Sequence, residues 1–302
     1  MRFCFGFAAV FISLFLVTSC NSDKKVATST TQLEEQIREK MKAFPEAKYA
    51  VAFRNLSNGE ELMINAEDSF HAASTMKTPV MIELYKRAAE GNYSMDSTIV
   101  IKNNFKSIVD GSEYRLDSMQ DSEHDLYLHV GEKMKVKDLI FRMITMSSNL
   151  ATNILIEEAD PKNIISTMRS IGADQIQVRR GVEDSKAFEL GLNNRTNAKD
   201  LMTIFTHLAN GTIVNKTTCD SMIVTLMQQH FTDRIPGKLP KDVKTATKSG
   251  SITKVCHDSG IVFLPDGKKY VVVILTSGIA NEEKASALIA DVSLAIYNYV
   301  TR

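Results

Sequence analysis

Apolar residues recur with a helical period in several stretches of the chain. Between residues 32 and 44 they fall on one helical face, at Leu33, Ile37, Met41 and Phe44, and Pro45 ends the pattern. A second such run, built on Val80, Met81, Leu84, Tyr85 and Ala88, predicts a helix from about Ala73. Further helices are predicted over 136–146, 149–158, 198–208, 219–230 and 282–300.

Strand patterns lie at the two ends of the chain. Residues 48–56 and 60–65 flank Ser57-Asn58-Gly59 and predict a β-hairpin, and 244–254, 259–264 and 270–276 predict three strands central to a sheet. One sheet built from distant segments, with a helical lobe between them, is therefore expected. The sequence predicts an α/β fold: an α/β part over about 32–73 and 197–302, and a helical part over about 74–196.

The first twenty residues predict an export signal. They combine a short basic start with an apolar run of about 15 residues. The ending Val17-Thr18-Ser19-Cys20 resembles the bacterial lipobox, which implies that Cys20 is lipidated and anchors a periplasmic or cell-surface lipoprotein to a membrane. The alternative is a cleaved signal with a fortuitous cysteine. Residues 21–31 are polar and predict a tether before a domain that begins near Gln32.

Composition excludes some classes of function. The 302 residues are 44% apolar and 24% charged, with a formal net charge of zero. The sequence contains no basic helix interleaved with aromatic residues, so a nucleic-acid partner is not expected. Glu123, His124, Asp125 and His129 lack the spacing of a metal site, so no metal or cofactor is expected. Cys219 and Cys256 are interpreted as buried thiols, although they could pair after export.

Ser74 and Lys77 are the first candidates for chemistry. At positions i and i+3 of a helix start they lie on one face, close enough to hydrogen-bond, and a serine needs such a base to become a nucleophile. Ser22 to Lys25 and Ser251 to Lys254 have the same spacing, but the former lies in the polar leader and the latter in a predicted strand. The simpler alternative for Ser74 and Lys77 is an ordinary helix start with a capping serine.

Two later motifs carry complementary groups. Ser147-Ser148-Asn149 lies where a loop meets a helix, so a hydroxyl and a carboxamide can face a cleft, unless the serines only cap the helix. Lys248-Ser249-Gly250-Ser251 opens a predicted strand and supplies a cation, a hydroxyl and approachable backbone N–H groups. These are the parts of an anion-binding site, although an edge-strand start has the same composition.

In this order the three motifs resemble those of the serine β-lactamases and penicillin-binding proteins, over roughly residues 32–302. The resemblance implies an antiparallel sheet flanked by helices, with an inserted helical subdomain and the site in the cleft between them. It also implies a small β-lactam substrate, no cofactor and a monomer. Within the superfamily, the class A β-lactamases are the preferred match.

The resemblance implies a role for each residue. Ser74 would be acylated with Lys77 and a glutamate as possible bases, and the N–H groups of Ser74 and Ser251 would form the oxyanion hole. Ser147 would protonate the leaving nitrogen. Lys248 and Ser249 would hold the substrate carboxylate beside Gly250, and Asn149 would hold its side-chain amide.

The glutamate that activates the hydrolytic water has two candidates. Glu183 lies 36 residues after Ser147 and is preferred, whereas Glu189 leaves too few residues before Thr196 and is kept in reserve. The asparagine expected four residues later is Ala187, which puts the positioning of the water in doubt. Ser148 replaces the usual aspartate of the second motif, which puts the bracing of that loop in doubt.

The sequence therefore predicts a class A serine β-lactamase that opens β-lactam rings through an acyl-serine intermediate. One alternative is a DD-peptidase or a related serine hydrolase acting on other amides or esters. Another is a β-lactam sensor that is acylated without turnover.

Overall fold

The computed structural model describes residue 1 and residues 22–302, the segment 22–29 by its backbone only. Cys20 and almost all of the predicted signal lie outside the described residues. Helix α1 (Ser22–Met41) begins ten residues earlier than predicted, so most of the segment expected as a polar tether, 21–31, is helical. None of the helices in the described part of the chain is long and apolar enough to cross a membrane.

The sheet has five strands in the order β2-β1-β11-β10-β9, and every neighbouring pair is antiparallel. This confirms a single antiparallel sheet assembled from both ends of the chain. The expectation that all three C-terminal strands are central is wrong for β9, which forms one edge. The strands are β1 (Lys48–Asn55), β2 (Glu61–Ile64), β9 (Lys244–Ile252), β10 (Val255–Phe263) and β11 (Lys269–Ser277).

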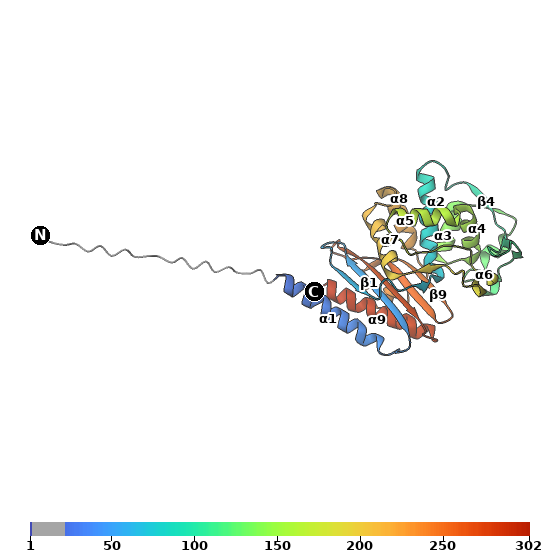
Figure 1. Cartoon of the computed structure of the whole chain (residues 1–302). Helices are drawn as coiled ribbons and strands as arrows, with labels where there is room; N and C mark the ends of the chain where they lie inside the picture. Colours follow the sequence, from blue (N-terminus) through green and yellow to red (C-terminus); the bar gives the residue numbers. More distant parts are fainter. Residues whose placement is uncertain (2–21) are drawn as a thin grey trace.

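Two apolar layers cover the sheet. Alternate residues of β1 point to opposite faces, so Val51 and Phe53 pack in one cluster with Leu33 of α1 and Ile289 of α9 (Glu282–Val300), while Ala52 belongs to the other. Figure 1 shows α1 and α9 side by side on the face away from the helical lobe. The first and last helices thus close one side of the sheet and leave the other to the lobe.

On the other side of the sheet lie five of the helices predicted from the sequence, together with α5 and the short α6, which were not predicted. Gly211 has a left-handed conformation and ends α7, as predicted. Cys219 and Cys256 are both buried and free, which confirms their interpretation as thiols. The helices are α2 (Lys77–Ala89), α3 (Val136–Thr145), α4 (Asn149–Ala159), α5 (Pro161–Ser170), α7 (Ala198–Asn210) and α8 (Lys216–Leu226).

Short elements connect the lobe to the sheet. Three small antiparallel pairs form between β3 and β8, β4 and β7, and β5 and β6. A single turn of 3₁₀ helix, η1 (Ala73–Met76), links β3 to α2 and lies against β9. The other short elements are β3 (Phe70–His71), β4 (Thr98–Val100), β5 (Phe105–Lys106), β6 (Glu113–Tyr114), β7 (Lys133–Lys135), β8 (Arg195–Thr196), α6 (Ser185–Glu189), η2 (Ser118–Gln120), η3 (Asp125–His129) and η4 (Ile235–Lys238).

Candidate active site

Ser74 lies in η1, where the helical lobe meets the edge of the sheet. Its side chain is partly exposed, and the preceding residue, Ala73, has a positive φ of 44°. The predicted hydrogen bond between Ser74 and Lys77 is not formed, and the Ser74 hydroxyl accepts or donates none within residues 22–302. The hydroxyl is therefore neither sealed in the core nor already committed to a partner.

Lys77 is fully buried at the start of α2. Its Nζ donates to the Ser147 carbonyl (2.6 Å), to Ser147 Oγ (3.2 Å) and to Asn149 Oδ1 (3.0 Å). Burial lowers the pKa of Lys77 to about 7, although the carboxylates of Asp121 and Glu183 oppose this shift. Near neutral pH a large share of this amine is therefore unprotonated and able to act as a base.

Ser147 joins two lysines. Its Oγ accepts from Lys77 Nζ and, at 3.1 Å, from Lys248 Nζ. The residue has a positive φ of 57°, and the adjacent Ser148 caps α4 by accepting from Ala151 N (3.3 Å). The capping alternative thus applies to Ser148, while Ser147 lies between two amines as a possible path for a proton.

Lys248 is buried on β9, and Nζ also donates to the Ser249 carbonyl (2.9 Å). Burial and the charge of nearby Lys77 hold the pKa of Lys248 well below its usual range, and Asp258 opposes this. An anion placed beside Lys248 would restore the protonated form. The lysine is thus suited to bind a negatively charged group rather than to remain paired within the protein.

The edge position of β9 explains how the strand serves the site. A Cβ added to Gly250 would lie 2.8 Å from Ser74 N and 3.0 Å from Thr75 N, so only glycine permits this approach. The Lys248 carbonyl accepts from Ser259 Oγ on β10 (3.2 Å). The Ser249 carbonyl instead accepts from Lys248 Nζ. Because backbone groups of alternate residues point to the same edge of a strand, we expect the N–H of Ser251, like the backbone carbonyl of Ser249, to point to the unpaired edge.

Asn149 connects the lysine to Glu183. Its Oδ1 accepts from Lys77, and its Nδ2 donates to Glu183 Oε1 (3.3 Å). Glu183 Oε2 accepts from Asp117 N (3.2 Å), and burial raises the pKa of this half-buried carboxyl. The other candidate, Glu189, is exposed at the end of α6. Of the two glutamates, only Glu183 belongs to the hydrogen-bond network of Lys77.

The loop that carries Glu183 is closed at its neck and anchored to α4. Buried Arg180 donates to the Leu192 carbonyl (3.1 Å) and to Asn193 Oδ1 (2.8 Å). Asn153, one turn after Asn149, accepts from Val182 N (2.6 Å) and donates to the Val182 carbonyl (3.1 Å). One face of α4 therefore fixes both the loop and the lysine.

Asp121 was not identified from the sequence. This buried carboxylate accepts from Asn149 N (2.9 Å), Leu150 N (3.0 Å) and the Tyr127 hydroxyl (2.9 Å), at the positive end of α4. Asp121 thus braces the loop of the second motif, the role that was in doubt because Ser148 replaces the usual aspartate. A single acidic residue in an irregular loop leaves no pattern that would have revealed it.

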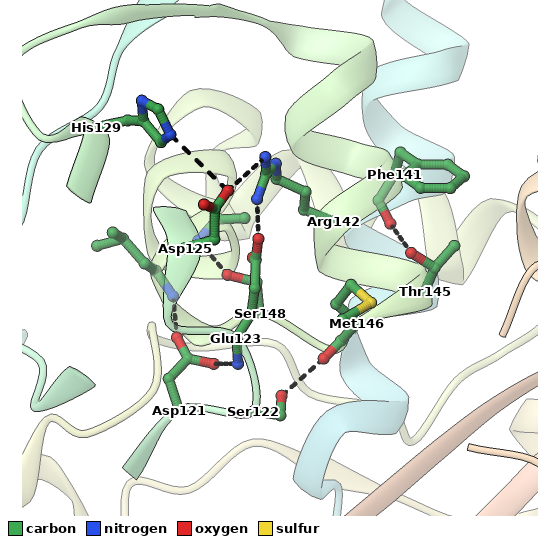
Figure 2. A network of polar contacts seen from close by, with 12 residues as sticks. Asp121, Ser122, Glu123, Asp125, His129, Phe141, Arg142, Thr145, Met146 and Ser148 are labelled. Atoms are coloured by element: carbon green, nitrogen blue, oxygen red, sulfur yellow. Dashed lines mark hydrogen bonds and ion pairs between the residues drawn. The ribbon is translucent and has the colours of Figure 1, made fainter. Parts of the chain in front are cut away.

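The loop that follows Asp121 is held by ion pairs (Figure 2). Arg142 of α3 contacts Glu123 and donates to Asp125 Oδ2 (3.0 Å), while His129 lies 3.8 Å from the same carboxylate. Ser122 Oγ donates to the Met146 carbonyl (2.7 Å), directly before Ser147. Glu123, Asp125 and His129 of the polar cluster thus form an ion-pair network with Arg142, and the side chains that the structure describes include no group of three or more suited to a metal ion.

Together these groups have the geometry of acyl transfer. The accessible Ser74 hydroxyl lies in η1, which packs against β9, and the network beside it holds one buried lysine suited to a base and a second suited to bind an anion. A half-buried carboxylate extends the same network. Hydrogen bonds join five of the predicted residues, namely Lys77, Ser147, Asn149, Glu183 and Lys248, and Ser74 and Gly250 lie where η1 packs against β9.

The sequence is similar to those of known β-lactamases. A family model described as "Beta-lactamase enzyme family" matches residues 32–300. The beta-lactamase VEB-1 of Pseudomonas aeruginosa is 22% identical over 319 aligned positions, which cover 96% of this chain and 96% of the relative. The extended-spectrum beta-lactamase PER-1 of the same organism is 23% identical, covering 97% and 94% of the two chains.

Solved structures share the fold. A leucine-to-glutamate mutant of PBP-A, in an acyl-enzyme complex with penicillin G, has a TM-score of 0.77 at 24% identity and covers 90% of this chain and 97% of its own. The TLA-3 extended-spectrum beta-lactamase has a TM-score of 0.79 at 20% identity, covering 90% and 100%. These similarities confirm the β-lactamase/transpeptidase-like fold predicted from the sequence.

Proposed function

The chain belongs to the beta-lactamase enzyme family, and from this premise we propose that it hydrolyses β-lactams through an acyl-serine intermediate. The observation that carries the proposal is one continuous set of hydrogen bonds, from Lys248 through Ser147, Lys77 and Asn149 to Glu183, beside the free hydroxyl of Ser74. Such an enzyme would serve β-lactam catabolism and antibiotic resistance.

Acylation begins when Ser74 Oγ attacks the lactam carbonyl carbon and passes its proton to the neutral amine of Lys77. The negative charge that develops on the carbonyl oxygen is held by the N–H groups of Ser74 and Ser251. One donor of this kind stabilises the transition state by about 3 kcal/mol. The carbon–nitrogen bond then breaks, and the nitrogen takes its proton from Lys77 through Ser147 Oγ.

Substrate recognition falls to the groups around the nucleophile. Lys248 and the Ser249 hydroxyl bind the β-lactam carboxylate, whose charge offsets the crowding of two buried amines. Asn149 donates to the amide of the acyl side chain while it holds Lys77. Gly250 allows the strand to lie flat against this part of the substrate.

Deacylation uses Glu183 as the base. Water forms a bond to the acyl carbon, one of its protons passes to the Glu183 carboxylate, and the carbon–Oγ bond breaks. The proton then returns to Ser74 Oγ, and the product leaves as a carboxylic acid. Burial, which raises the pKa of Glu183, makes its carboxylate a better proton acceptor provided that it stays ionised.

The test is Glu183→Gln, with Glu189→Gln as the matched control. A chromogenic cephalosporin should be hydrolysed by the native protein, while Glu183→Gln should still be acylated but accumulate the adduct on Ser74, with turnover lowered about 10²–10⁴-fold. Mass spectrometry of the intact protein measures the adduct. Glu189→Gln should turn over like the native protein.

Other outcomes separate the alternatives. A native adduct that persists for hours would favour a DD-peptidase or a sensor, and accumulation only in Glu189→Gln would move the base to that residue. A folded native protein that neither forms an adduct nor hydrolyses the substrate would refute the proposal.

We also propose that the protein is exported and held at a membrane by a lipid on Cys20, as a monomer. The support is the sequence of residues 1–20, with its apolar run and terminal Val17-Thr18-Ser19-Cys20. Cys20→Ala should move the protein from the membrane fraction to the soluble fraction of cells. A native protein that is already soluble would refute the anchor, and sedimentation of the lipid-free protein tests the monomer.

A further inference from the structure

The hydrogen bonds that the structure describes to the Glu183 carboxylate all come from residues outside the loop that carries Glu183. Four residues after the glutamate, where the resemblance implies an asparagine, the loop has Ala187, whose methyl group is fully buried. Even so, each carboxylate oxygen of Glu183 has one N–H donor: Asn149 Nδ2 at 3.3 Å and Asp117 N at 3.2 Å. The second donor comes from a loop 66 positions earlier in the chain.

The segment 105–117, which contains the small hairpin of β5 and β6, contacts the glutamate's loop on both sides of Glu183. Before it, the Tyr114 hydroxyl donates to the Val182 carbonyl (3.3 Å). After it, buried Asp184 accepts from Ser107 Oγ (2.8 Å) and from Ile108 N (3.0 Å). Segment 105–117 thus holds the backbone before the glutamate and the side chain of the residue after it, and its last residue contacts the carboxylate itself.

We propose that the backbone N–H of Asp117 positions the Glu183 carboxylate for deacylation, in a loop where Ala187 offers no side-chain donor. The inference builds on the proposed function, since it concerns the same acyl-enzyme. Asp117 is a positioning residue, because its N–H contacts the base and not the substrate.

The physical reason is that one donor on each oxygen fixes the plane of a carboxylate. With Asn149 alone, Glu183 could rotate about its last side-chain bond and lose its line to the water. A displacement of about 1 Å at such a group can cost on the order of 100-fold in rate. The N–H of Asp117 also opposes the effect of burial on the pKa of Glu183, so it favours the ionised form of the base.

The experiment compares Asp117→Pro with Asp117→Ala. Both variants lose the carboxylate, which accepts from Met119 N (2.9 Å), but only proline removes the N–H, and the φ of −90° at this position is not far from proline's range. Relative to alanine, proline should slow deacylation about 10- to 100-fold and leave acylation within a factor of a few. It should also move the acidic limb of the deacylation pH profile to higher pH.

A third variant guards against misfolding. Replacing residue 117 by the α-hydroxy analogue of aspartate turns the N–H into an ester oxygen while keeping the side chain, and it should reproduce the slow deacylation. Equal deacylation rates and equal pH profiles in the proline and alanine variants, or native deacylation in the ester variant, would overturn the inference. Failure of the native protein to be acylated would instead refute the proposed function.

Discussion

The two walls of the candidate active site are built in different ways. On the sheet side, Lys248 to Ser251 lie on a regular strand, and Gly250 contacts the backbone of η1 so closely that a methyl group would not fit. On the opposite side, Glu183 lies in a loop held by hydrogen bonds to α4 and to the segment 105–117. In the proposed mechanism, acylation would thus use groups fixed by secondary structure, whereas deacylation would use a group fixed by contacts between loops.

This difference predicts separable failures. Changes on the strand side should disturb acylation, because the nucleophile and the anion site share one rigid junction. Changes on the loop side should spare acylation and slow deacylation, because the loop can relax without moving η1.

The largest effect should follow from Gly250→Ala. The added Cβ would lie 2.8 Å from Ser74 N and 3.0 Å from Thr75 N, both backbone atoms, so η1 or β9 must shift. Acylation should fall on the order of 100-fold, measured as the burst in stopped-flow absorbance. Gly237→Ala is the control, since its nearest contact is the Ala290 Cβ at 3.4 Å. An unchanged burst in Gly250→Ala would show that the junction is not rigid.

The second effect is the pH dependence of acylation. An ordinary lysine loses its proton, and so can act as a base, only near pH 10, but the pKa of Lys77 is lowered to about 7. Protonation below pH 7 removes the base, so the acylation rate should rise about tenfold from pH 6 to pH 8. Asp121→Asn removes a charge that raises this pKa, so it should move the midpoint to lower pH. A rate that is flat over this range would exclude Lys77 as the base.

The smallest effect is expected from Asp184→Ala on the loop side. It leaves the Ser107 hydroxyl and the N–H groups of Ile108 and Ala187 without an acceptor, which should cost about 1–3 kcal/mol of unfolding free energy. Deacylation should slow several-fold while the burst persists. The control is Asp110→Ala in the same hairpin, because Asp110 is exposed and its contacts, an ion pair with Lys186 and hydrogen bonds from Ser112, lie at the surface. A weakened burst would contradict the separation of the two walls.

Much of the fold followed from local patterns. The period of apolar residues located α1, α2, α3, α4, α7, α8 and α9 and all five strands of the main sheet, because burial of one face imposes that period on helices and strands. The end of α7 at Gly211 also followed, since a left-handed residue there favours glycine. The early start of α1 and the edge position of β9 did not, because neither changes the local pattern.

The sequence by itself determined which side chains could do the chemistry: each motif alone is weak, but Ser74 with Lys77, the Ser147 to Asn149 motif and Lys248 to Ser251 occur in the order of a known family. Only the tertiary structure decided how they are held. It made Ser147, not Ser74, the hydrogen-bond partner of Lys77, and it placed Asp121 at the start of α4 and the N–H of Asp117 on Glu183. A backbone N–H is the same in almost every residue, so its role arises from the fold and leaves no trace in the sequence.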